Sequence, residues 1–140
     1  YNGEFMDGVY HGTGVLKMED GTEFEGDFVR GFAEGNVEIR FPSGASYSGK
    51  LTVRLSCDMN QMNCSKNSVY QGEGILSNSS GDRFEGQFKD GQRHGNGVLV
   101  MVSGIRLEGE WKEDQRWNLV AYDPDGSQRG RYEDGVWKSP

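Results

Sequence analysis

The chain has 140 residues, with 22 acidic and 15 basic side chains and a formal net charge of −7 at pH 7. This negative field repels nucleic-acid phosphates and anionic lipid headgroups, so no nucleic-acid partner is expected. Only 34% of the residues are hydrophobic and 22 are glycine, a composition that favours a thin sheet over a thick two-layer core. No apolar run reaches the roughly 18 residues that a transmembrane helix needs.

One pattern returns about every 23 residues: a large apolar side chain, any residue, Gly, a polar residue and a second large apolar side chain. A Gly-containing turn, a Gly-x-Gly segment and an Asp-Gly or Ser-Gly pair follow. The pattern starts at residues 1, 24, 47, 84 and 107, so the spacings are 23, 23, 37 and 23 residues. A period in this range is typical of a stacked array of one supersecondary unit. We predict one array over 1–140, with repeats at approximately 1–23, 24–46, 47–83, 84–106 and 107–127 and a partial repeat at 128–140.

Each repeat reads as two short strands. Residues 1–5 alternate in the period of a strand, Met6-Asp7-Gly8 supplies a turn, and residues 12–18 alternate again. Asp20-Gly21 then closes the hairpin, because Asp-Gly is among the strongest short hairpin signals. No segment shows capped helical periodicity. The sequence therefore predicts an all-β antiparallel meander of about 11 strands.

The glycines and the aromatic rings have a joint explanation. A ring on a neighbouring strand can lie across a glycine and cover its exposed backbone. The rings at the first and fifth repeat positions should therefore stack in rows along one face. By alternation, the acids Glu4, Asp27 and Glu110 should form a solvated opposite face. For any single ring, packing within the array is the alternative to partner contact.

The third repeat carries 14 extra residues within 52–69, for which we expect an extended hairpin with its tip around 58–63. The insert is either a contact element or a tolerated insertion, and its Met59 and Met62 are adaptable apolar side chains. Two further departures are Val37, which replaces a repeat glycine, and 117–120, which replace His-Gly-x-Gly after a turn that looks one residue shorter.

Cys57 and Cys64 both lie in the insert. Their spacing without further nearby ligands is poor for zinc, so free thiols are favoured over a disulfide or a metal site. A secreted disulfide scaffold would carry more cysteines. The chain is therefore predicted to be intracellular, either cytoplasmic or organelle-associated.

No arrangement of residues in the sequence predicts catalysis. His11 and His94 recur at one repeat position, which favours a structural hydrogen bond at a turn. The Gly-x-Gly segments lie inside strands and are not followed by a helix, so a phosphate loop is not predicted. No base is placed beside a nucleophile. We expect no catalysis, no cofactor and no metal.

The segments Tyr1-Asn2-Gly3-Glu4-Phe5 to Gly14 and Phe84-Glu85-Gly86-Gln87-Phe88 to Gly97 carry the clearest signature. With them the chain resembles the MORN (membrane occupation and recognition nexus) repeat family, apart from the insert and the last few residues. The resemblance implies a single-layer, twisted antiparallel sheet that is elongated and curved. It also implies a docking platform for peptides or proteins or a homodimerising module, with peripheral membrane association in some members through the parent protein.

A single-layer sheet cannot bury both faces, and contiguous exposed apolar surface usually marks an interaction site. The sequence therefore predicts a scaffold, within a larger multidomain protein, that binds a partner peptide or domain along an aromatic-lined groove. The residues predicted to line it are Tyr1, Phe5, Phe24, Phe28, Tyr47, Phe84, Phe88, Trp111, Trp117 and Tyr122.

Two alternatives stay open. A phosphoinositide or membrane-surface binding module would need clustered bases, and here they gather only loosely among acids, at Lys89, Arg93, Arg106, Lys112 and Arg116. The chain could also be a regulatory or dimerisation region fused to an enzyme.

Overall fold

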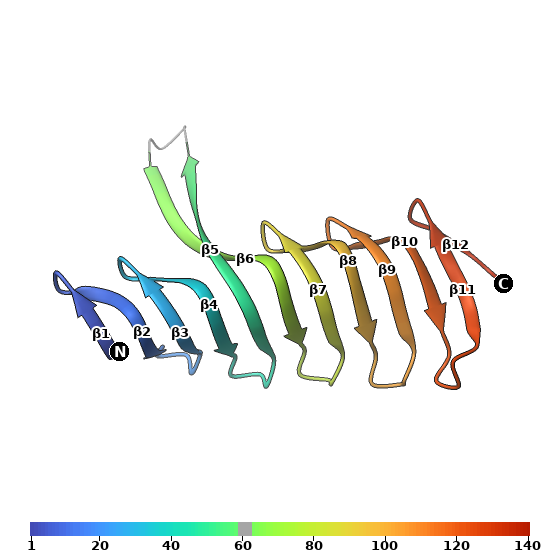
Figure 1. Ribbon diagram of the computed structural model, residues 1–140, viewed down its shortest axis with the longest axis horizontal. Helices are drawn as coiled ribbons and strands as arrows, with labels where there is room; N and C mark the ends of the chain where they lie inside the picture. The colour runs from blue at the N-terminus through green and yellow to red at the C-terminus, as the bar shows by residue number, and fades with distance from the viewer. Residues whose placement is uncertain (59–62) are drawn as a thin grey trace.

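The computed structural model describes residues 1–58 and 63–140, and in 54–58 and 63–67 its description is limited to the backbone. All strands join one antiparallel sheet, in which β1 to β12 follow one another in chain order. The array is elongated, with the two termini at opposite ends (Figure 1). No helix that could cross a membrane occurs in the part of the chain that the structure describes.

The strands are β1 (Asn2–Met6), β2 (Val9–Lys17), β3 (Glu23–Val29), β4 (Phe32–Arg40), β5 (Ser46–Asp58), β6 (Asn63–Ser77), β7 (Arg83–Lys89), β8 (Gln92–Val100), β9 (Arg106–Lys112), β10 (Gln115–Tyr122), β11 (Gln128–Glu133) and β12 (Val136–Lys138). The all-β antiparallel meander predicted from the sequence is confirmed. The described residues form 12 strands instead of about 11, because Val136–Lys138 pairs with β11 as a short last strand.

Two kinds of turn alternate along the chain. Within a repeat, a two-residue turn such as Asp7-Gly8 joins the strands, with φ of 52° and 80°. Positive φ at both central residues is the type I′ geometry that matches strand twist. Between repeats the turn is wider. The N–H of Gly21 donates to the carbonyl of Met18 at 3.1 Å, and Gly21 has a φ of 97°. Asp20-Gly21 thus lies in a longer loop than a two-residue hairpin turn.

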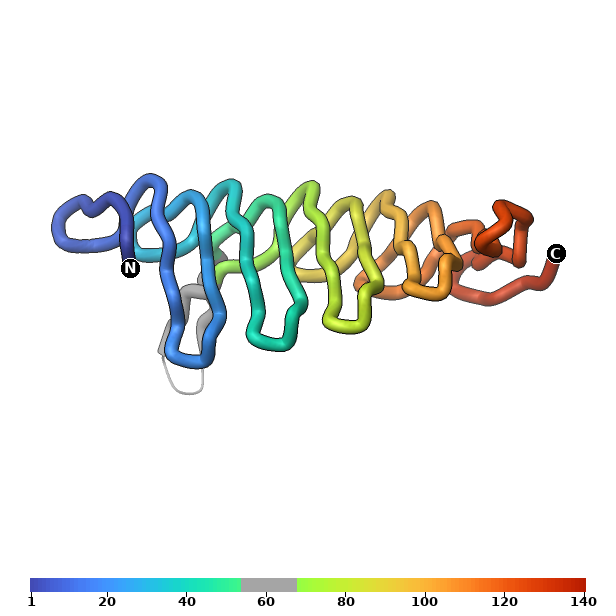
Figure 2. The backbone as a smooth tube through the Cα atoms, turned by 90° about the horizontal axis from the view of Figure 1, so that it is seen from below, coloured from blue at the N-terminus to red at the C-terminus, as the bar shows by residue number. Residues whose placement is uncertain are grey.

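The first glycine of Gly-x-Gly forms a bulge. Gly3 pairs with Gly14 and Phe5 pairs with Tyr10, so the second strand carries extra residues between these two pairs. Gly12 lies in this stretch with a φ of 71°, a region that glycine enters without steric cost. Bulges bend the strand that carries them. The ribbons of β2, β4, β6 and β8 bend accordingly, and Figure 2 shows the bent hairpins following one another along the long axis.

The second glycine lets a ring lie on the backbone. Gly49, Gly74, Gly86, Gly97 and Gly109 pair in one row across five strands. A Cβ on Gly74 would lie 2.6 Å from the hydroxyl of Tyr47, and one on Gly97 would collide with the ring of Phe84. This confirms that the paired glycines make room for rings from neighbouring strands.

The residue after the first-strand glycine caps the bulge. The N–H of Thr13 donates to Oε2 of Glu4 at 2.7 Å, and the N–H of Asn36 donates to Oδ2 of Asp27 at 3.1 Å. Gln87 accepts from the N–H of Asn96 in the same way, at 3.1 Å. Glu4 and Asp27 therefore do more than form a solvated face, which corrects the expectation from alternation alone.

The fifth repeat keeps the same turn length as the others. Its turn is the two-residue pair Glu113-Asp114. The repeat is one residue shorter because its bulge holds one extra residue, Trp117, where the bulge of the first repeat holds two. The expectation of a shorter turn is therefore wrong. The turn hydrogen bond expected for the histidines is present at His94, whose Nδ1 accepts from the N–H of Glu113 at 3.3 Å.

The insert extends one hairpin, as predicted. β5 and β6 stay paired as far as Asp58 and Asn63, and the extension stands out from the array in Figure 1. The hydroxyl of Ser68 ties its base to β4 by donating to the carbonyl of Ala33 at 2.7 Å. The predictions about Met59 and Met62 and about the thiols of Cys57 and Cys64 lie outside what the structure describes.

We expect Gly97→Ala to lower the free energy of unfolding by about 1–3 kcal/mol, because a methyl group there overpacks the ring of Phe84. Denaturant unfolding measures the change. Gly8→Asn is the matched control, since nothing lies within 4 Å of a Cβ at Gly8 and Asn tolerates its positive φ. An unshifted midpoint for Gly97→Ala would show that the ring does not need the bare backbone.

Asp27→Ala should cost about 1 kcal/mol of stability, because the N–H of Asn36 loses its acceptor. Asp27→Asn should recover most of the loss, since the amide of Gln87 fills the same role in the fourth repeat. Equal destabilisation by both variants in the same unfolding assay would show that the charge matters and the acceptor does not.

Candidate functional site

Five of the ten predicted lining residues are buried. Phe28, Tyr47, Phe84, Phe88 and Trp111 each expose 3% or less of their surface. These rings pack the array, which is the alternative weighed for single rings in the sequence. Their partner-binding role stays a prediction, and in this conformation they offer a partner little surface.

The buried rings form a ladder between repeats. The first-position ring of one repeat meets the fifth-position ring of a later repeat edge-to-face, a favoured aromatic geometry. The centroid distances are 5.1 Å for Tyr1–Phe28, 5.5 Å for Tyr47–Phe88 and 5.3 Å for Phe84–Trp111.

The tenth repeat position adds a flat side chain to this ladder. Tyr10 stacks on Tyr1 with centroids 4.1 Å apart, and Tyr70 stacks on Tyr47 at 3.9 Å. In the fourth repeat, Arg93 takes this place and its guanidinium lies 5.6 Å from the ring centroid of Phe84. The tenth position therefore covers the first-position ring of its own repeat.

Burial keeps the tyrosine stack uncharged. It raises the pKa of Tyr47 to about 12, with a smaller contribution from Tyr70, and burial also raises the pKa of Tyr70. Both phenols therefore stay neutral to a higher pH than a solvent-exposed tyrosine does. The hydroxyl of Tyr47 donates to the carbonyl of Lys50 at 2.8 Å, so the buried polar atom is satisfied.

The other five predicted residues fall into two groups. Phe5 is 59% exposed, and Tyr1 and Phe24 are partly buried on the ring-bearing face. Trp117 and Tyr122 instead lie against Lys112 and Arg106, at 4.4 Å and 4.9 Å from their ring centroids.

Strand alternation explains why Tyr122 leaves the ring-bearing face, and the bulge at Trp117 shifts the alternation so that Trp117 lies beside Lys112. Tyr122 pairs with Arg106, and the next residues along the two strands, Ala121 and Leu107, pair within the core. Successive side chains point to opposite faces. The groove predicted from the sequence therefore does not include these two residues on its face.

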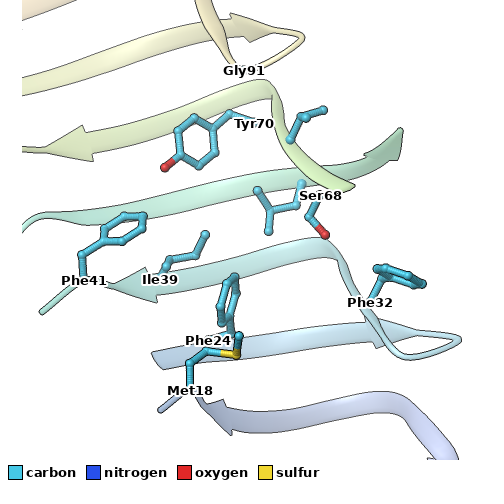
Figure 3. Close-up of a pocket in the computed structure, with 10 residues that line it drawn as sticks. Met18, Phe24, Phe32, Ile39, Phe41, Ser68, Tyr70 and Gly91 are labelled. Atoms are coloured by element: carbon cyan, nitrogen blue, oxygen red, sulfur yellow. The ribbon is translucent and has the colours of Figure 1, made fainter. Parts of the chain in front are cut away.

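A hollow of about 520 Å³ opens on the ring-bearing face across β3 to β6 (Figure 3). Phe24, Ile39 and Phe41 come from the second repeat and its following turn, and Tyr70 comes from the third. Its remaining lining residues are Met18, Phe32, Leu51, Ser68, Val69 and Gly91. Among the residues that the structure describes, the lining contains no charged side chain, so an apolar group fits it.

Three substitutions in the repeat pattern create the hollow. Ala33 pairs with Phe28 as Tyr10 pairs with Phe5, so it occupies the tenth position without a ring. Leu51 stands at a fifth position, and Val37 replaces the glycine on which a ring would lie. Among the side chains that the structure describes, Phe24 is consequently the first-position ring that contacts no other ring.

The sequence analysis named only Phe24 among the residues that line the hollow. It missed Ile39, Phe41 and Tyr70, because each fits the apolar alternation of an ordinary strand or its following turn. Ala33 was the available signal, since it breaks a tenth position that is Tyr in the first and third repeats.

The opposite face pairs its bases with acids. Arg40 contacts Glu23, Glu25 and Glu38 at 2.9, 2.8 and 2.8 Å. These carboxylates raise the pKa of Arg40, with the largest effect from Glu25, and the hydrogen bond from Arg40 lowers the pKa of Glu23. This guanidinium is thus already neutralised by its neighbours.

Three of the five bases considered for lipid binding are also engaged by polar groups. Arg93 contacts Asp114 at 3.2 Å and Arg106 contacts Glu108 at 3.4 Å. Arg116 donates to the hydroxyl of Tyr132 at 2.9 Å. Within the described residues, no three His, Cys, Asp or Glu side chains gather as a metal site would require.

Comparison with known proteins agrees with this architecture. The MORN repeat family model matches residues 1–23, 24–46, 84–106 and 108–118. Alsin of Rattus norvegicus is 34% identical over 93 residues and Alsin of Homo sapiens 34% identical over 98 residues.

In both cases the match covers 66% of this chain but only 5% of the length of Alsin. The family matches together cover more than half of the chain, and they fall on hairpins with the bulge and ring positions described above. The chain belongs to the MORN repeat family.

Proposed function

We propose that this chain is a protein-interaction module that binds a peptide or partner domain on its ring-bearing face, within a longer protein. MORN repeats serve as protein-binding or membrane-binding units. The observation that carries the choice is the hollow of about 520 Å³ across β3 to β6, which is apolar and open to solvent. Concave apolar sites with few polar groups are typical binding sites.

Membrane binding is the less supported of the two family roles. The net charge of −7 opposes anionic headgroups. Arg40, Arg93 and Arg106 each contact a carboxylate, which leaves less basic surface for phosphate. The proposal therefore places the binding energy in apolar contact with a protein.

The similarity to Alsin supports only the assignment of this chain as a MORN repeat module. Because the match spans 5% of that protein, the activity of a whole protein is not transferred to this chain. No catalytic role is proposed for the array. Its intracellular location and its self-association as a homodimer stay predictions from the sequence.

Met18→Glu should abolish selective peptide binding while leaving the array folded. Met18 lines the hollow and is 48% exposed, so a charge there blocks apolar contact without burying a carboxylate. Peptides enriched from a random phage-displayed library on the wild-type chain should bind this variant at least about 10-fold more weakly, a loss typical of an interface anchor. Calorimetry measures the affinities.

Val102→Glu is the control, because it adds the same charge at a side chain that is 74% exposed on a different inter-repeat turn. It should leave peptide affinity and the melting temperature unchanged. Flotation with phosphatidylcholine vesicles with and without phosphoinositide, at about 0.15 M salt, tests the other role. The proposal fails if no peptide family is enriched, if both variants bind equally, or if only the phosphoinositide vesicles bind.

A further inference from the structure

We infer that the hollow across β3 to β6 takes one aromatic side chain from a partner segment whose flanking residues are basic. The inference rests on the proposed function and names the chemical class of its partner. It follows from an interruption of the ring ladder, from the lining of the hollow and from the charge of the neighbouring turns.

The interruption is a missing ring. In the first and third repeats the tenth-position tyrosine covers the first-position ring, as Tyr10 covers Tyr1 at 4.1 Å and Tyr70 covers Tyr47 at 3.9 Å. In the second repeat Ala33 occupies this position, and Phe24 is left without a ring against it. An aromatic side chain from a partner could stack on Phe24 as Tyr10 stacks on Tyr1 and Tyr70 on Tyr47.

The walls of the hollow suit such a side chain. Figure 3 shows Phe24 and Ile39 side by side, with Phe41 at one end and Tyr70 across from them. The hydroxyl of Ser68 already donates to the carbonyl of Ala33, so it makes no demand for a polar ligand. A volume of about 520 Å³ lies within the range of ligand pockets, roughly 300–1,000 Å³, and holds one ring with part of its backbone.

The charge of the turns beside the hollow predicts the charge of the partner residues on either side of the aromatic side chain. Met18 lines the hollow and begins the inter-repeat turn 18–22, which also carries Glu19 and Asp20. Phe41 also lines the hollow and begins the next such turn, 41–45, and the two turns together hold two carboxylates and no Lys or Arg.

Asp20 is held in its charged form by its own turn. The N–H of Thr22 donates to Asp20 at 2.8 Å and lowers the pKa of that carboxyl, so Asp20 is ionised at the rim of the hollow. An edge of one charge sign attracts the opposite sign and repels its own. Lys or Arg on either side of the aromatic anchor is therefore favoured over Asp or Glu.

A panel of short peptides tests both features. The probes are acetyl-Lys-Lys-Xaa-Lys-Lys-amide with Trp, Phe, Leu or Ala as Xaa, and the Glu-flanked peptide with Trp. Methyl NMR of Ile39 and Leu51 reports binding in the hollow. The Trp and Phe peptides should bind at least about 5-fold more tightly than the Ala peptide, and exchanging Lys for Glu should weaken binding by at least about 5-fold.

Two variants separate the ring contact from general apolar burial. Ala33→Tyr places the ring of the first and third repeats in the second, and should weaken the Trp peptide by at least about 10-fold. Phe24→Leu keeps the site apolar and should bring the Trp and Leu peptides to within about 2-fold of each other. Trp137→Leu, at a partly exposed ring on β12 outside the hollow, is the control and should change neither ratio. Phe24→Leu decides the question if Ala33→Tyr fails to fold.

Equal affinity for the Trp and Ala peptides, no shift at the Ile39 and Leu51 methyl groups, or retained Trp preference in Phe24→Leu would overturn the inference. The proposed function can survive that outcome. If library-derived peptides still bind the wild-type chain and lose affinity in Met18→Glu, the module binds proteins but not through an aromatic anchor.

Discussion

The structure depends on aromatic rings that lie directly on backbone without a Cβ. A single-layer sheet has no second layer to bury its apolar face, so the rings themselves must provide the layer. They can do so only where glycine lets them approach, as Tyr47 approaches Gly74 and Phe84 approaches Gly97. The bulges serve the same end, because bent strands bring the rings of successive repeats into contact. Repeated glycine is thus a packing requirement of this fold and not a mark of flexibility.

The same requirement explains where the candidate site lies. Where the pattern is complete, rings such as Trp111 are almost wholly buried and the face is closed. Where Ala33, Val37 and Leu51 replace pattern residues, the ladder is incomplete and the hollow opens. In an array of this kind a binding site can arise by removing a packing residue, with no need to add a chemically reactive one.

Much of the fold could be predicted from the sequence because its determinants are local. The spacing of the repeat, the Gly-containing turns and the strand alternation each lie within a few residues, and they predicted the meander and the extended hairpin. The bulge could not be found this way. It depends on how two strands pair, and therefore the roles of Glu4 and Asp27 and the position of Trp117 were missed. The hollow was missed for a related reason. Ile39 and Tyr70 fit the pattern of ordinary strand residues, and only the missing ring at Ala33 shows that they line an open space.

Because the strand order follows the chain, each strand pairs in the sheet only with its neighbours in sequence, and the ring contacts reach just one strand further. Such a sheet has no long-range tie that fastens one end to the other, so the free energy of each hairpin is set mainly by the two beside it. Tension applied between the termini passes through every ladder in series, so each ladder carries the same force and the weakest opens first. The array would lengthen in steps while the remaining repeats stayed intact. Mechanically, the molecule is a row of separable links, and the strength of the row is that of its weakest link.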